Sequence, residues 1–444
     1  MKKLFEGNIR KNFFIYAFPL ILTALLSQSY NFINTYMAGH FLGDTGISSV
    51  GSVTPFSTLI SSLCWGYVTG FSIYVATLYG RNEYKSMINV IKTNILITSL
   101  VIVCFSISCI LFKEPIFNYL NIEHELKKDA SIYFIIIMAG LVINHQVWIG
   151  VYVANAIGIT MFPFVASFIT SFLNILGNYI LIKYFNLGVA GIALSTLISN
   201  FITAIFYYIV LGKAFLKMGC VLSGIYFDRK EISTSFKFGF PTMLQQSVMY
   251  ICTMVTSPLT NSCGSNAIAG YTVGMRLYDL NAAVYQNSNK TVSNYIAQCI
   301  GGEKYHLLKK GIKTGIIQTG LFLLPFLAIT VFGAEFFGDL FLDNEEGISY
   351  ASSFMKFCMP FVVFNVINNL MHAIFRSMGA GKILVCSTVV YSLTRIIFSY
   401  LLFGRYKMYG IFAAIVLSWI IESIYGLGMY FFGNWKNNIK TKIF

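Results

Sequence analysis

The sequence has 444 residues, of which 56% are hydrophobic and only 11% are charged. A chain of this size with so little polar surface cannot cover a water-soluble particle, which excludes a soluble globular protein. The formal net charge of +14 does not indicate a nucleic-acid partner, because basic and aromatic residues are not interleaved in a soluble domain. The composition is that of a membrane protein with many spans.

Twelve apolar segments are long enough to cross a bilayer, since about 20 helical residues span roughly 30 Å of hydrocarbon. In chain order the predicted helices cover residues 12–37, 47–79, 88–112, 131–155, 162–182, 188–211, 239–262, 267–299, 312–333, 350–375, 383–403 and 409–432. We therefore predict an all-α membrane protein with twelve transmembrane helices. Two outer segments, 113–130 and 334–349, are predicted to form short amphipathic caps at the membrane surface.

The basic residues fall mainly on one side of this predicted arrangement. With the N-terminus in the cytoplasm, the inner segments hold 21 of the 31 Lys and Arg residues, and the outer segments hold six. Cytoplasmic loops carry such an excess, so both termini are predicted to be cytoplasmic. The same charges attract anionic headgroups, which makes membrane lipids a predicted partner. The richness in Lys, Ile, Asn, Phe and Tyr is typical of a bacterial inner membrane protein.

The two halves of the sequence repeat each other. A shift of 221 residues superimposes Gly80 on Gly301, Asn144 on Asn365, Gly158 on Gly379 and Ile91-Lys92-Thr93 on Ile312-Lys313-Thr314. Because each half holds six spans, both halves have the same orientation, as a parallel repeat about an axis along the membrane normal. We predict two pseudo-symmetric six-helix lobes, 1–212 and 238–444, joined by a cytoplasmic connector, 213–237. Paired bundles of this kind commonly enclose a substrate path, which indicates a transporter.

Pro19 and Pro241 occupy nearly matching places in the first span of each half. Each proline removes one backbone hydrogen bond and permits a bend. A shared hinge and simple helix packing are both consistent with this pair.

No motif of a membrane enzyme or of a metal site is found in the sequence. The nine cysteines are scattered through the predicted spans without a CxxC or CxxH pattern, and HExxH, GxSxG and Walker A motifs are absent. We therefore predict a protein that is not an enzyme and that holds no metal ion.

Several segments resemble the multidrug and toxic compound extrusion (MATE) family, over nearly the whole chain. The resemblance rests on Phe18-Pro19-Leu20-Ile21-Leu22, Tyr30-Asn31-Phe32-Ile33-Asn34-Thr35, Phe41-Leu42-Gly43, Asn174-Ile175-Leu176, Gly188-Val189-Ala190-Gly191-Ile192-Ala193 and Phe375-Arg376-Ser377-Met378-Gly379. It implies a V-shaped pair of lobes that exports drugs or other small organic molecules in exchange for H⁺ or Na⁺. It implies no cofactor beyond this coupling ion, and we expect a monomer.

The chain departs from the family at three positions where acids are usual. Asn34, Asn178 and Asn365 stand there as amides, and an amide does not titrate in an accessible pH range. With Tyr133, Asn174 and Thr196, which match the polar cluster of the family's first lobe, Asn34 and Asn178 can line a neutral site for Na⁺ or substrate. The alternative is that these polar groups hold helices together.

Charged residues inside the predicted spans are confined to the second half, where Arg276, Asp279, Lys290, Lys356, Arg395 and Glu422 are found. A charge at the bilayer centre costs about 2.5 to 3.5 kcal/mol even on the translocon scale, so each needs a partner or a function. We predict that Asp279 or Glu422 pairs with Lys290 or Arg395. Such a pair serves either the structure or a protonation switch, and both readings stay open. The histidines of the spans are interpreted as packed residues.

The sequence therefore predicts a secondary active antiporter that exports small organic molecules. The alternative is a flippase for an anionic lipid-linked or polysaccharide substrate, motivated by the excess of cations over acids within the second half. A scaffold or receptor without transport activity leaves the full-length repeat without a purpose.

Overall fold

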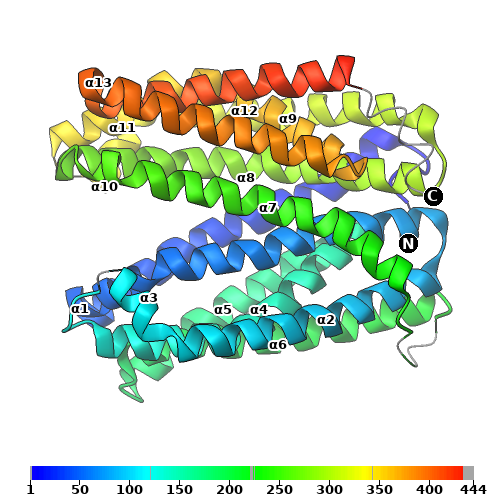
Figure 1. Ribbon diagram of the computed structural model, residues 1–444, viewed down its shortest axis with the longest axis horizontal. Coiled ribbons are helices and arrows are strands. Elements are labelled where there is room, and N and C mark those ends of the chain that lie inside the picture. The colour runs from blue at the N-terminus through cyan, green and yellow to red at the C-terminus, as the bar shows by residue number, and fades with distance from the viewer. Residues whose placement is uncertain (1–2, 121, 221–223, 225, 343, 434–444) are drawn as a thin grey trace. The chain divides into compact units, whose positions relative to one another are not determined.

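The computed structural model describes residues 3–120, 122–220, 224, 226–342 and 344–433, apart from the side chains of residues 29–36, 38–40, 42–45 and 47. These residues form helices joined by short turns (Figure 1). The elements are α1 (Ile9–Arg81), α2 (Tyr84–Leu111), α3 (Lys113–Tyr119), α4 (Lys127–Ala156), α5 (Met161–Lys183), α6 (Gly188–Lys217), α7 (Arg229–Asn261), α8 (Ser265–Gly301), η1 (Tyr305–Leu307), α9 (Leu308–Phe332), α10 (Ala334–Phe341), α11 (Glu345–Cys358), η2 (Met359–Phe361), α12 (Val362–Ser377) and α13 (Gly381–Phe432).

The twelve predicted transmembrane helices are confirmed. In the described part of the chain nine helices are long and apolar enough to cross a membrane, and α1 supplies two of them, Ile9–Gln28 and Ser48–Arg81. One of the nine, α13, consists of two helices that meet at Lys407, whose φ of 48° is not helical. The remaining two helices, α7 and α8, are long enough but more polar, and the polar side chains of α8 are largely buried.

Backbone geometry repeats with the sequence. Positive φ, which residues other than glycine rarely adopt, recurs at three matched turns, and two of these turns hold no glycine at that position. These turns lie 221 residues apart and comprise Asn82 with Glu303, Gly158 with Gly379, and Asn186 with Lys407. The two outer segments also match, because each begins with a short helix. These helices, α3 and α10, start at Lys113 and Ala334, which are 221 residues apart.

The turns at Gly158 and Gly379 show why glycine stands at this place in both halves. Each lies two residues after the last residue of a helix and has a left-handed φ, 86° at Gly158 and 68° at Gly379. Each helix end is closed by a backbone bond five residues back, from Ile159 N to Ala154 O and from Ala380 N to Phe375 O, both 2.8 Å. A glycine adopts this conformation without the penalty of a Cβ atom, so the repeated glycine is explained by the helix end.

The packing of the chain defines two compact units. The first unit holds Leu22–Gly239 together with Lys3, and the second unit holds Leu4–Ile21 together with the chain from Phe240 onward. The sequence placed the boundaries at 212 and 238 instead. The difference arises because two segments, Leu4–Ile21 and the start of α7, pack in the unit opposite to their own sequence half.

Leu4–Ile21 packs into the core of the second unit. Phe13 is fully buried, and its ring lies 5.0 Å from that of Tyr295 on α8, edge to face. The hydroxyl of Tyr16 accepts a hydrogen bond from Asn294 across 2.8 Å, and the backbone N–H of Leu4 donates to Gln298 across 2.9 Å. Apolar burial and these polar contacts together tie the segment to α8.

The start of α7 is tied to the first unit in the same way. Tyr74 donates a short hydrogen bond to the Glu231 carboxylate, and Asn94 on α2 donates to Ser235 across 3.1 Å. A Cβ atom built on Gly239 would lie 2.5 Å from the ring of Tyr67. The missing side chain of this glycine therefore allows the close approach.

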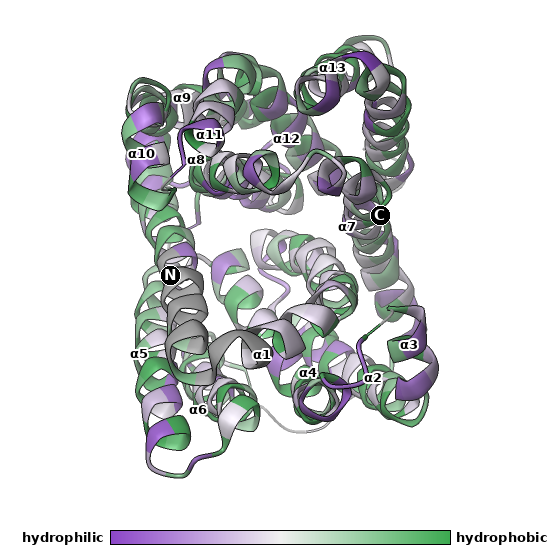
Figure 2. Ribbon diagram, turned by 90° about the vertical axis from the view of Figure 1, so that its left-hand side faces the viewer, coloured by the Kyte–Doolittle hydropathy of each residue, from purple (hydrophilic) through white to green (hydrophobic). Residues whose placement is uncertain are grey.

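The interior of the second unit is built around α8. This helix packs against α9, α11 and α12, and most of its residues beyond Asn281 are buried. In Figure 2 the hydrophobic colour dominates α5, whereas α8 shows pale and hydrophilic stretches. Its contact with α9 depends on Gly311 and Gly315, a pair spaced as in the GxxxG motif that lets membrane helices approach closely.

Candidate functional site

In the first unit, α5 and α6 hold a network of amides and hydroxyls. Asn174 donates to Thr196 Oγ1 across 3.0 Å. Asn178, one turn further along α5, donates to Asn174 Oδ1 across 3.0 Å and accepts from Ser195 Oγ across 2.5 Å. The exposed fractions of Asn174 and Asn178 are 0% and 1%. Three predicted site residues are thus brought together in one buried network.

Two further predicted residues of this unit are placed differently. Tyr133 on α4 is half-buried and packs against Ile182 of α5 and Ile192 of α6. Asn34 lies outside the residues whose side chains the structure describes. The oxygen and nitrogen of the Asn174 amide both have partners within the network, an arrangement that suits a helix-to-helix contact.

We expect Asn178→Ala to lower the stability of the first unit by about 1 kcal/mol, because Asn174 loses a donor and Ser195 loses an acceptor. Thermal unfolding in detergent measures this change, and ligand affinity is measured in parallel. Ser171→Ala on the same helix is the control, since among the described residues the Ser171 hydroxyl donates to the carbonyl of Ser167, one turn back on its own helix. A weakened ligand affinity with an unchanged unfolding temperature would instead assign the network to binding.

In the second unit, Asn365 lies between two tyrosines of α8. Its amide nitrogen donates to the hydroxyls of Tyr278, at 2.6 Å, and Tyr285, at 3.1 Å. The two hydroxyls are themselves 3.0 Å apart. The ring of Tyr278 stacks on Trp419 of α13 with centroids 5.7 Å apart. Asn365 thus joins α12 to an aromatic cluster, and its partners among the described residues are uncharged hydroxyls.

The charged residues of this unit do not pair as the sequence suggested. Asp279 and Lys290 on α8 are half-buried, and eleven residues place them about 16 Å apart along the helix axis. The charge that acts most strongly on Asp279 is that of Arg276. Arg395 is 8% exposed and donates to the hydroxyl of Tyr391 across 2.8 Å. Asp279 and Arg395 thus have Arg276 and Tyr391 as neighbours in place of the predicted partners, and the pairing of an acid with Lys290 stays a prediction.

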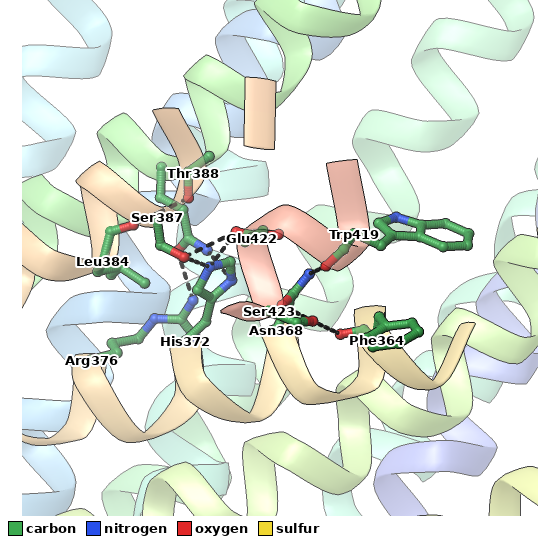
Figure 3. Close-up of polar contacts among 11 residues, drawn as sticks. Phe364, Asn368, His372, Arg376, Leu384, Ser387, Thr388, Trp419, Glu422 and Ser423 are labelled. Atoms are coloured by element: carbon green, nitrogen blue, oxygen red, sulfur yellow. Dashed lines mark hydrogen bonds and ion pairs between the residues drawn. The ribbon is translucent and has the colours of Figure 1, made fainter. Parts of the chain in front are cut away.

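Glu422 pairs with a histidine instead. Its Oε1 lies 3.0 Å from Nε2 of His372 on α12, and Ser387 donates to the same oxygen across 3.1 Å (Figure 3). The exposed fractions of Glu422 and His372 are 3% and 6%. A carboxylate and an imidazole therefore face each other in the interior of the second unit.

Two polar residues extend this pair toward α7. The Nδ1 atom of His372 lies 2.9 Å from Nε2 of Gln245 on α7. The other end of the Gln245 amide, Oε1, accepts from Arg376 across 2.8 Å. Arg376 lies one turn after His372 on α12. The four side chains from Arg376 to Glu422 form a continuous chain, which we call the α12 relay.

The α12 relay is held in place by a second group of hydrogen bonds on the same helix (Figure 3). Asn368 donates to the backbone oxygen of Trp419 across 3.0 Å. Ser423 donates to Asn368 across 2.7 Å and also lies 2.8 Å from the carbonyl oxygen of Phe364. These bonds join α12 to the end of α13 that carries Glu422, so the position of the carboxylate is set by packing as well as by its own contacts.

Sequence reasoning named Glu422 but missed the functional interpretation of His372, Gln245 and Arg376. A signal was available, because Asn368, His372 and Arg376 follow one another at intervals of four residues and so lie on one face of a helix. Polar residues that follow this spacing through an apolar span face a protein interior rather than lipid.

Comparison with known proteins identifies the family. The family model described as MatE matches residues 19–180 and 241–401, one match in each half of the repeat. The chain belongs to the MatE family. This confirms the resemblance seen in the sequence and makes the chain a multi-pass membrane protein of a transporter family.

Relatives of this MatE chain include proteins named for drug export. Multidrug export protein MepA of Staphylococcus saprophyticus is 24% identical over 428 residues, which is 95% of this chain and 93% of the relative. MepA of Staphylococcus aureus strain MRSA252 is 24% identical over 416 residues, 93% of this chain and 90% of the relative.

The same MatE fold is found in solved structures. One, the outward-facing conformation of a multidrug resistance MATE family transporter of the MOP superfamily, has a TM-score of 0.88, 20% identity and 99% coverage of both chains.

Proposed function

We propose that this chain exports drugs or other small organic molecules across the cell membrane in exchange for H⁺ or Na⁺, with Glu422 and His372 as the coupling site. Membership of the MatE family and the names of the MepA relatives support the export of drugs. The observation that carries the coupling site is the buried pair of Glu422 and His372. We further propose that the protein acts as a monomer with both termini in the cytoplasm.

The buried carboxylate provides the physical means of coupling. An ionised carboxylate in a membrane interior is costly unless it is paired, and a proton or a cation that neutralises it changes which contacts are favourable. If two conformations of the protein differ in those contacts, ion binding shifts the equilibrium between them. The amides at Asn178 and Asn365 cannot take up a proton in this way.

The flippase alternative loses the charge excess that motivated it. Arg276 is exposed. Lys356 is also exposed, and it forms a salt bridge of 2.5 Å with Glu335 on α10. The hydrogen bond from Lys356 lowers the pKa of the Glu335 carboxyl below its ordinary value. Of the charges that the sequence placed inside the spans, two cations, Lys290 and Arg395, then remain in the interior beside two acids, Asp279 and Glu422, so this set no longer favours an anionic substrate.

Reconstituted protein in liposomes tests the proposal. Cationic, neutral and anionic fluorescent compounds are loaded, and their movement is followed after a proton gradient or a sodium gradient is imposed separately. We expect transport of organic cations or neutral drugs to respond to one of the two gradients and to stop when that gradient is dissipated. Transport of none of the compounds under either gradient, in vesicles shown to hold folded protein, would refute the proposal.

A further inference from the structure

We infer that the α12 relay holds His372 as a neutral imidazole with its proton on Nε2, so that Glu422 alone takes up the coupling proton. Arg376 is then a positioning residue that acts through Gln245. This inference rests on the proposed function, because it concerns the ion that the same site binds. It is derived from the direction of each hydrogen bond in the relay.

The first step fixes the orientation of the Gln245 amide. The Arg376 guanidinium has only donors, so the atom that it approaches at 2.8 Å must be an acceptor. That atom is the oxygen of the Gln245 amide, and the nitrogen of the amide must therefore point the other way. The choice between oxygen and nitrogen, which geometry alone often leaves open, is decided here by the arginine.

The second step fixes the tautomer of His372. The amide nitrogen of Gln245 can only donate, and it lies 2.9 Å from His372 Nδ1. Nδ1 must then accept the hydrogen bond and carry no proton. A neutral imidazole has its one proton on the other nitrogen, so Nε2 is the donor to Glu422 Oε1 across 3.0 Å.

The third step assigns the proton to Glu422. A second proton on His372 would have to bind at Nδ1, where it would face the amide hydrogens of Gln245, and the amide cannot turn without losing Arg376. Glu422 meets no such obstacle. Both donors, His372 and Ser387, approach its Oε1, and no described residue bonds to its Oε2. A proton that binds at Oε2 keeps the other contacts of the carboxyl intact.

The remaining charged and titratable groups near Glu422 do not replace this role. On its own element, α13, the phenol of Tyr391 interacts electrostatically with Glu422 and accepts from Arg395. On α12 the neighbours are His372 and Arg376, and α7 contributes the uncharged Gln245. No ion pair joins Glu422 to a charged residue of α8 within the described chain.

Nitrogen NMR of the protein labelled with ¹⁵N-histidine reads the tautomer directly. The chain has five histidines, and His372→Gln identifies the signal of interest. We expect an unprotonated Nδ1 and a protonated Nε2. His145, whose Nε2 bonds to Thr98 in the first unit, serves as an internal reference.

Gln245→Glu replaces the donor that faces His372 Nδ1 with an acceptor. The new carboxylate still accepts from Arg376. We expect the His372 signal to become that of an imidazolium, and the pH profile of transport to show two ionisations in place of one. Arg376→Met gives a second route, since it frees the amide to turn and should allow both tautomers. Arg376→Lys keeps a donor and should restore the single tautomer.

Two outcomes separate this inference from the proposed function. A proton on Nδ1 in the unmodified protein overturns the inference while leaving ion coupling by Glu422 testable by transport. The other outcome is a proton on Nε2 of His372 combined with transport rates that do not change with either gradient. It preserves the inference about His372 and refutes the proposed function.

Discussion

Glu422→Gln is expected to reduce gradient-driven export by about tenfold or more, a loss that corresponds to roughly 1.4 kcal/mol in the coupling step. Glutamine keeps the size of the side chain and an oxygen that accepts from Ser387 and His372, so the fold is preserved. It carries no charge that a proton or a cation can neutralise. The measurement is the initial rate of drug movement in liposomes under each imposed gradient, with the thermal unfolding temperature as a check on folding.

Two variants control for this loss. Glu335→Gln removes an exposed acid of the same unit, whose salt bridge with Lys356 lies at the surface, and it should leave transport unchanged. Glu422→Asp keeps a titratable group and should retain part of the response to the gradient. Full gradient dependence in folded Glu422→Gln would remove this carboxylate from the coupling mechanism and direct attention to Asp279, the other acid of the interior.

Gly311→Ala is expected to destabilise the second unit by about 1 to 3 kcal/mol, the usual cost of forcing extra atoms into a packed interior. A Cβ atom at this position would lie 1.9 Å from the ring of Tyr295. Tyr295 is fully buried, contacts Phe13 on one side and donates to the backbone of Leu307 across 3.1 Å. The ring cannot turn aside, so α9 must move away from α8. Thermal unfolding in detergent measures the change.

Gly320→Ala is the matched control, because no atom lies within 4 Å of the added Cβ and the residue is on the same helix. Alanine favours a helix over glycine by about 1 kcal/mol, so this variant should be neutral or slightly more stable. Equal unfolding temperatures for Gly311→Ala and the unmodified protein would show that α8 and α9 are less tightly packed than their geometry implies. Gly315→Ala, with its Cβ 2.2 Å from Val292, should repeat the loss.

The number and order of the helices were predictable because they depend on local properties of the chain. Hydrophobic length marks each span, and the 221-residue repeat fixes which spans correspond. The span that corresponds to α8, residues 267–299, was also predicted, although many buried side chains of this helix are polar. The internal break of α13 was foreseen as two spans, and the left-handed turn at Lys407 now shows where they join.

The partners inside the second unit were harder to predict. Which residue faces Glu422 depends on how far α13 is rotated about its axis relative to α12, and a single sequence contains no direct record of that angle. The charges in the sequence suggested Lys290 or Arg395 as the partner, whereas the residue that faces Glu422 is His372. In the first unit the spacing of Asn174 and Asn178 on one helix face was local information, and the two side chains are hydrogen-bonded; their part in binding stays a prediction.

The placement of Leu4–Ile21 in the second unit has a consequence for how the protein is made. This segment is synthesised early, and the partner of Tyr16, Asn294, follows 278 residues later. The N-terminal helix must therefore wait in the bilayer for most of translation with its inner face uncovered. Its largely apolar surface can remain in lipid during that delay. Its few polar contacts form once α8 has been synthesised, and the second unit is complete only then.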